Sequence, residues 1–196
     1  MSIIQDILDY NGEFVKGKEY ETFVSSKFPD KKIAVVTCMD TRLTELLPAA
    51  MNFKNGDIKI IKTAGGIITH PFGSVMRSLL IAVYELGVED IIIIGHHECG
   101  MQSIDSELMV EKMKERGICE KDLEVMKFSG INVEKYFRGF EKVEDSVNGS
   151  VSVVTNHPLI PSDINIYGCV MDPNTGKLEL INKVGTKLTN LIYYLN

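Results

Sequence analysis

Apolar residues in this chain gather in short runs separated by longer segments with helical spacing. Three of the runs, over residues 32–37, 57–62 and 90–95, are rich in β-branched residues. The first and third runs are nearly continuous, which is typical of strands buried on both faces of a parallel sheet. We therefore predict three parallel strands in the first half of the chain.

The segments between these strands favour helices. Residues 43–51 form the first, and residues 72–86 carry apolar side chains at helical spacing, with Gly87 placed as a C-terminal stop. The order is then strand, helix, strand, helix, strand. This alternation predicts an α/β fold with crossover connections.

The N-terminal segment predicts one more helix. Ser2 and Gln5 have the spacing of a capping box, and the helix is expected to run to about Tyr10, where Asn11 and Gly12 would end it. Much later, residues 103–156 are charged and helical in pattern, with breaks expected at three glycines, Gly117, Gly130 and Gly139.

The C-terminal part returns to strands. Residues 164–171 and 177–181 flank a turn sequence, 172–176, with proline and glycine in favourable places, and a last helix is expected over 186–195. We predict a central, mostly parallel β-sheet with an antiparallel edge strand, flanked by helices. The whole chain, residues 1–196, is expected to form a single domain.

Charge and composition narrow the possible partners. The net charge is -6, the isoelectric point is near 5.3, and no cluster of Lys and Arg stands out, which argues against nucleic acid as a partner. No apolar run approaches a membrane span, and the first residues lack the pattern of a signal peptide. We expect a cytoplasmic protein whose four cysteines are thiols or metal ligands.

Candidate chemistry follows two of the predicted strands. Cys38, Asp40 and Arg42 come directly after the first, and the segment 96–99, His-His-Glu-Cys, follows the third. Parallel strands end at one edge of a sheet, so the two motifs should converge there. Two thiolates and one imidazole are a common ligand set for a catalytic zinc, with a fourth position left for water.

Simpler interpretations of the same residues remain open. Cys38 and Cys99 can be ordinary buried thiols, since free cysteine is among the most buried residue types. Asp40 can be a permanent fourth ligand of a structural zinc. Asp40 and Arg42 can also form a plain ion pair at a strand end.

Several motifs, in this order, resemble a known family. They are Cys38-Met39-Asp40-Thr41-Arg42, Ala64-Gly65-Gly66, Gly95-His96-His97-Glu98-Cys99-Gly100, and the late stretch from His157-Pro158-Leu159-Ile160-Pro161 to Asp172-Pro173-Asn174-Thr175-Gly176. The chain resembles the β-class carbonic anhydrases, in particular their small prokaryotic branch.

The resemblance implies roles for these residues. Cys38, His96 and Cys99 would bind one Zn²⁺ per chain, and Asp40 and Arg42 would form a catalytic dyad beside it. In a closed form of such sites, Asp40 is a fourth metal ligand. The backbone of three glycines would line the cleft, namely Gly65, Gly66 and Gly100.

The resemblance also implies an activity. It is the zinc-dependent, reversible hydration of carbon dioxide to bicarbonate and a proton, with zinc-bound hydroxide as the nucleophile. Hydrolysis of carbonyl sulfide or carbon disulfide on the same site is the alternative enzyme, and a non-catalytic zinc or redox sensor is a different class of hypothesis. A homodimer or a multiple of dimers is expected, with the apolar face of the N-terminal helix, Ile3, Ile4, Ile7 and Leu8, against a second copy.

Overall fold

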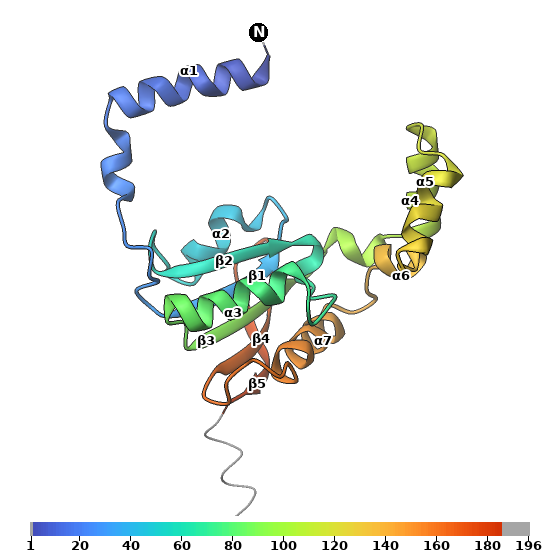
Figure 1. The fold of residues 1–196 in the computed structure, drawn as a ribbon. Helices are drawn as coiled ribbons and strands as arrows, with labels where there is room; N and C mark the ends of the chain where they lie inside the picture. The colour runs from blue at the N-terminus through green and yellow to red at the C-terminus, as the bar shows by residue number, and fades with distance from the viewer. Residues whose placement is uncertain (1, 186–196) are drawn as a thin grey trace, which may run out of the picture.

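The computed structural model describes residues 2–185, which form a five-stranded sheet with the order β2-β1-β3-β4-β5 (Figure 1). Strands β1 (Ile33–Cys38), β2 (Ile58–Thr63), β3 (Asp90–His96) and β4 (Asn165–Met171) are parallel to one another. Strand β5 (Leu178–Val184) pairs antiparallel with β4. The predicted fold class is confirmed.

Helices cover both faces of the sheet. Helices α3 (Ser74–Leu86) and α7 (Val143–Thr155) pack on one face, where their apolar side chains meet Ala34, Val36, Ile91 and Ile93 of β1 and β3. Helix α2 (Leu43–Ala50) packs on the other face, where it meets Val35 and Ile94. Neighbouring residues of a strand thus enter different cores, which explains why β1 and β3 are almost continuously apolar.

Two glycines let α7 approach the sheet closely. A Cβ atom on Gly95 of β3 would lie 2.6 Å from Val143 Cγ2 and 2.7 Å from Val147 Cγ2. One on Gly168 of β4 would lie 2.9 Å from Val147 Cγ1. Because Gly95 immediately precedes His96, this packing also fixes the backbone next to a predicted metal ligand.

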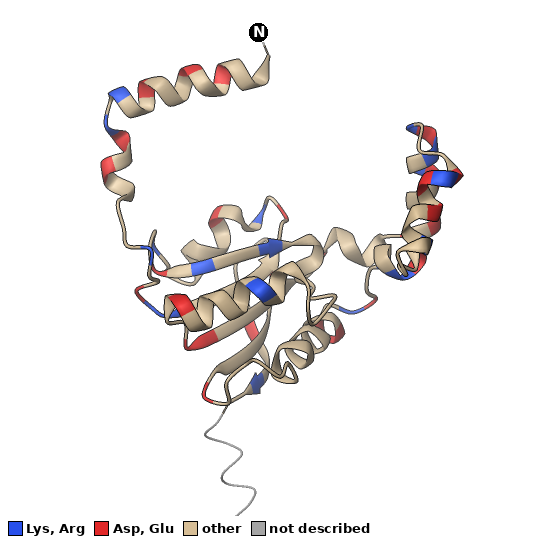
Figure 2. Cartoon of the chain, viewed as in Figure 1, with Lys and Arg blue, Asp and Glu red and all other residues tan. Residues whose placement is uncertain are grey.

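The charged segment after β3 forms a helical arm. After the short 3₁₀ helix η3 (Gly100–Ser103), it consists of α4 (Ser106–Glu115), α5 (Glu120–Phe128) and α6 (Val133–Phe137), which pack against one another. These helices end close to the three predicted glycine breaks. Figure 1 shows the arm standing away from the sheet, and Figure 2 shows that charged residues are dense along it.

The N-terminal helix α1 (Ile3–Lys16) is longer than predicted, so the expected end at Asn11 and Gly12 is wrong. A single glycine costs a helix only about 1 kcal/mol relative to alanine, and the amphipathic pattern continues beyond it. Ser2 precedes α1, but its side chain makes no capping hydrogen bond, so no capping box forms. The 3₁₀ helix η1 (Glu19–Phe23) follows, and neither helix buries a residue.

Two more predictions concern the chain ends. The expected helix over 186–195 lies outside the described residues. Between residues 2 and 185, no helix combines the length and the apolar character that a bilayer crossing requires.

Candidate active site

The two predicted motifs meet at the carboxyl edge of the sheet. Strands β1 and β3 are parallel neighbours and end at Cys38 and His96, and Cys99 follows three residues later. One ligand atom from each of these side chains lies within 4.8 Å of the other two, and all three residues are buried. The two sulfur atoms are 3.8 Å apart.

The hydrogen bonding of His96 fits a metal ligand. Its Nδ1 atom lies 2.8 Å from the backbone oxygen of His97, which can only accept, so Nδ1 carries the proton and donates. The lone pair is then on Nε2, which is buried and has no hydrogen-bond partner among the described residues. A buried acceptor without a partner is costly, and a metal ion bound to Nε2 removes that cost.

The contact between the two thiols shifts their pKa values in opposite directions. A hydrogen bond from Cys99 lowers the pKa of Cys38, and the same contact raises the pKa of Cys99, which keeps its proton beside the thiolate. A soft cation that displaces this proton would be held by two thiolates and one imidazole. That donor set is suited to zinc, so the residues present fit the metal that the sequence predicts.

Asp40 and Arg42 lie beside the three donors. Nε and Nη2 of Arg42 donate to the two carboxylate oxygens of Asp40 at 3.1 and 2.9 Å. This bidentate contact lowers the pKa of Asp40 to about 2. Oδ2 of Asp40 is 3.8 Å from Nε2 of His96, so the carboxylate faces the predicted metal position and stays ionised.

Glu98 is a site residue to which the sequence assigned no role. Its carboxylate Oε2 lies 3.3 Å from Nη1 of Arg42, and its backbone oxygen accepts from Nη2 at 3.0 Å. Glu98 has a φ of 54°, in the left-handed region that few residues other than glycine adopt. No sequence pattern predicts this backbone turn. The turn directs Glu98 toward Arg42.

A cavity of about 380 Å³ opens beside the predicted metal position. Cys38, Asp40 and Cys99 line it, together with an apolar wall that includes Ala64, Met101 and Ile104. Such a wall suits a small, apolar substrate rather than a charged one.

The three glycines predicted for the cleft differ in position. Gly65 and Gly100 line the cavity. Gly65 and Gly66 belong to the 3₁₀ turn η2 (Ala64–Gly66) that follows β2, and Gly66 is not among the lining residues. A Cβ on Gly66 would lie 3.2 Å from the backbone nitrogen of Cys38, so Gly66 supports the ligand loop from behind.

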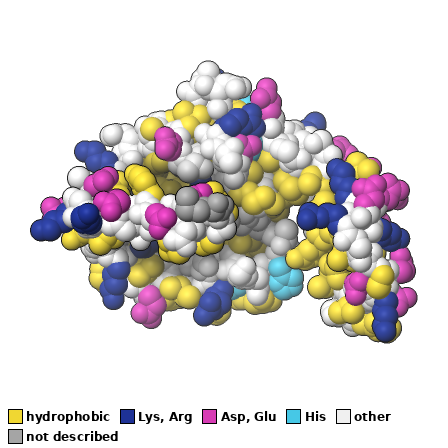
Figure 3. Space-filling model, turned by 90° about the horizontal axis from the view of Figure 1, so that it is seen from above, with side chains coloured by type: hydrophobic (Ala, Val, Ile, Leu, Met, Phe, Trp, Pro, Cys, Tyr) yellow, Lys and Arg dark blue, Asp and Glu magenta, His cyan; other side chains and the backbone are white. Residues whose placement is uncertain are grey.

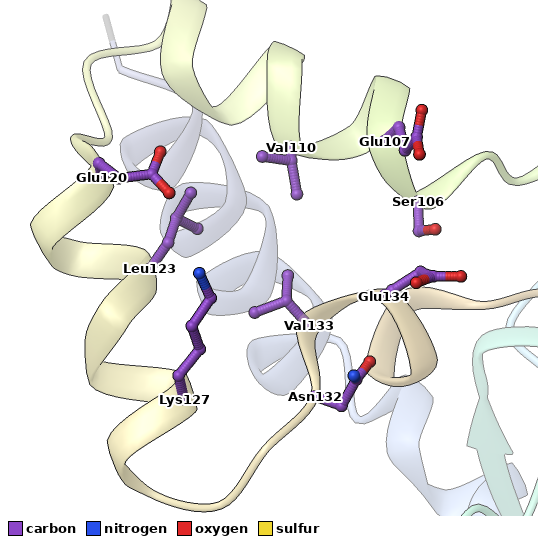
Figure 4. Close-up of a pocket in the computed structure, with 9 residues that line it drawn as sticks. All are labelled: Ser106, Glu107, Val110, Glu120, Leu123, Lys127, Asn132, Val133 and Glu134. Atoms are coloured by element: carbon purple, nitrogen blue, oxygen red, sulfur yellow. The ribbon is translucent and has the colours of Figure 1, made fainter.

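A larger cavity of about 450 Å³ lies in the arm, between α4, α5 and α6 (Figure 4). Leu123, Val110 and Val133 form its apolar part, and the side chains of Glu120 and Lys127 extend toward it. It contains none of the predicted site residues and no cysteine or histidine. The remaining two cysteines are also apart from the metal site, with Cys119 exposed and Cys169 buried.

Comparison with known proteins identifies the family of the chain. The family model described as "Carbonic anhydrase" matches residues 33–178. The "Putative carbonic anhydrase YtiB" of Bacillus subtilis is 55% identical over 181 residues, which are 92% of this chain and 97% of the relative. A carbon disulfide hydrolase of Acidithiobacillus thiooxidans is 30% identical, over 76% of this chain and 77% of its own.

Among solved structures, the β-carbonic anhydrase isoform I of Trichomonas vaginalis superposes with a TM-score of 0.83. It is 36% identical, over 92% of this chain and 98% of its own. The fold and the site define an α/β protein in which two cysteines and one histidine meet at the carboxyl edge of a mostly parallel sheet. The chain belongs to the β-carbonic anhydrase family.

Proposed function

We propose that this protein catalyses the zinc-dependent, reversible hydration of carbon dioxide to bicarbonate and a proton. The observation that supports it most is the convergence of Cys38, His96 and Cys99, with the ionised Asp40 directed at the same point. When zinc is bound, it supplies the Lewis acid that makes a water molecule nucleophilic near neutral pH.

The side chains around the metal position would orient the reactants. Asp40, ionised at working pH because Arg42 lowers its pKa, can accept a hydrogen bond from the attacking water and so fix the direction of its lone pair. Arg42 holds that carboxylate in place with two hydrogen bonds. The apolar wall formed with Met101 and Ile104 offers a linear, uncharged molecule a place beside the nucleophile.

Hydrolysis of carbon disulfide or carbonyl sulfide is the second candidate. Two observations favour keeping it: the 30% identity with a carbon disulfide hydrolase and the apolar character of the cavity wall. These substrates are also linear and apolar, and they require the same nucleophile. The choice between carbon dioxide and these sulfur compounds as substrate therefore depends on the cavity walls rather than on the metal ligands. A non-catalytic zinc or redox sensor is the third hypothesis, and the intact Asp40–Arg42 pair argues against it.

The test is a stopped-flow measurement of carbon dioxide hydration on protein of known zinc content. Release of hydrogen sulfide from carbon disulfide and carbonyl sulfide is measured on the same preparation. We expect rapid carbon dioxide hydration that scales with zinc content. Rapid sulfide release without hydration would favour the second candidate, and no turnover of any of the three would favour the sensor.

We further propose that the protein is a homodimer or a multiple of dimers. The apolar face of α1 lies open in the single chain, with Ile3 76% and Ile4 57% exposed, and Figure 3 shows apolar side chains along α1 and on the arm. A second copy would cover these side chains. We propose a cytoplasmic location, which is supported by the four cysteines being free.

A further inference from the structure

Asp40 and Arg42 hold each other, but they lie on the same loop after β1. Their mutual hydrogen bonds therefore do not fix the pair relative to His96, at the end of β3, and Cys99, in the loop that follows it. Glu98 supplies the missing connection, because it is adjacent to Cys99 and contacts Arg42 through both its carboxylate and its backbone oxygen. The guanidinium is thus held by Asp40 at one edge and by Glu98 at another.

We propose that Glu98 is a positioning residue that fixes Arg42, and through it Asp40, relative to the metal ligands; this inference rests on the proposed function of the site. Within residues 2–185, Asp40 and Glu98 are the acids that form an ion pair with Arg42. Glu98 accepts from Nη1, which Asp40 does not contact, and from Nη2, which also donates to Asp40, so the planar group cannot rotate without losing a contact.

The backbone of Glu98 offers a way to separate positioning from folding. A φ of 54° is sterically unfavourable for glutamate and carries no steric cost for glycine. Glu98→Gly should therefore fold at least as well as the parent while it lacks the carboxylate. Glu98→Gln keeps the shape and an acceptor oxygen but removes the charge. If Glu98 served only to form the backbone turn, Glu98→Gly would keep full activity, because glycine forms the same turn.

The first experiment is a double-mutant cycle with kcat and KM for carbon dioxide hydration, at equal zinc content. We expect Glu98→Gln and Glu98→Gly to lower kcat roughly 3- to 10-fold with KM unchanged, because an exposed ion pair contributes modestly. In an Arg42→Ala background, the same changes should alter kcat less than 2-fold, since Glu98 acts through Arg42. The control is Glu89→Gln, which removes a charge from an exposed ion pair with Lys32 far from the site and should leave kcat unchanged.

The second experiment does not depend on turnover. The chain has four arginines, Arg42, Arg77, Arg116 and Arg138, so the Nε–H resonance of Arg42 can be assigned by its loss in Arg42→Ala. We expect this proton to exchange with water several-fold faster in both Glu98 variants than in the parent. An unchanged exchange rate, or equal losses of kcat with and without Arg42, would overturn the proposal. If the parent hydrates no carbon dioxide, the proposed function fails, and the exchange rate still decides whether Glu98 holds Arg42.

Discussion

At the scale of single residues, Arg42 gives the sharpest test of the proposed dyad. Arg42→Ala leaves Cys38, His96 and Cys99 untouched, so zinc content should stay near that of the parent. The pKa of Asp40 should rise from about 2 toward its usual range, and the carboxylate should lose its fixed direction. We expect the rate constant to fall roughly 30- to 1,000-fold, comparable to the loss of one preorganised donor.

Stopped-flow hydration assays from pH 7 to 9, with zinc determined on the same samples, check this prediction. Asp40→Ala combined with Arg42→Ala should be scarcely slower than the slower single variant, because the two residues act as a unit. Near-normal hydration by zinc-replete Arg42→Ala would contradict the dyad mechanism and would leave the ligand assignment intact.

The ligand assignment has its own test. Cys38→Ser, His96→Ala and Cys99→Ser should each lose zinc or bind it far more weakly, because each removes one of three protein donors. The two other thiols provide matched controls: Cys119→Ser and Cys169→Ser should retain about one zinc per chain. Elemental analysis of the purified variants measures the zinc content per chain and so tests the assignment. Full zinc in Cys99→Ser would show that a different set of donors binds the metal.

The sequence was sufficient to predict the candidate metal ligands, but it did not predict the residue that contacts Arg42 from the second loop. Cys38 and His96 could be brought together because β1 and β3 were recognisable as buried parallel strands, and parallel strands end at one edge. Glu98 could not be found in this way. Its contact with Arg42 depends on a left-handed backbone at a glutamate and on a 3.3 Å approach between two loops, and neither leaves a periodic signal in the sequence.

At the scale of secondary structure elements, the packing of α7 on β3 is the feature most easily tested. Gly95→Ala would place a Cβ 2.6 Å from Val143 Cγ2, so α7 must move or β3 must shift. We expect a loss of about 1 to 3 kcal/mol in the free energy of unfolding. Zinc affinity should also weaken, because the backbone of His96 moves with Gly95.

Urea unfolding and competition with a chelator measure these two effects. Gly149→Ala is the matched control within α7, since nothing lies within 4 Å of the added methyl group. It should raise the free energy of unfolding by about 0.5 to 1 kcal/mol, as expected for glycine replaced by alanine in a helix. If Gly95→Ala were as stable as the parent, α7 would be able to move away from β3 without a loss in the free energy of unfolding.

Strands were easier to predict than helix ends. Strands β1, β3 and β4 coincide with apolar runs, because burial imposes its own pattern on the sequence. Strand β5 buries no residue, and it continues to Val184, past the predicted end at 181. Glycines were ambiguous as helix stops: α4 ends beside Gly117, whereas α1 continues through Gly12 to Lys16. A glycine is therefore an informative stop only where the apolar pattern also ends.

At the scale of the whole molecule, the proposed dimer depends on α1. Replacing Ile4 and Ile7 together by aspartate puts two charges on its apolar face and should convert the protein to monomers. Asp9→Lys changes the charge of the same helix by two units on the opposite face and should leave the assembly intact. Light scattering at micromolar concentration measures the mass. A monomeric parent, or a double variant that remains assembled, would contradict the proposal.

The separation of the metal donors along the chain has a consequence for stability. Cys38 and Cys99 are 61 positions apart, so an ion bound to both would act as a cross-link that closes a long loop. By analogy with a disulfide that closes a loop of this size, the lost entropy of the unfolded chain corresponds to about 4 kcal/mol. The loop contains α2, β2, α3 and β3, so the bound ion would connect the carboxyl ends of the two adjacent strands β1 and β3. Bound zinc would then stabilise the folded state as well as take part in the reaction.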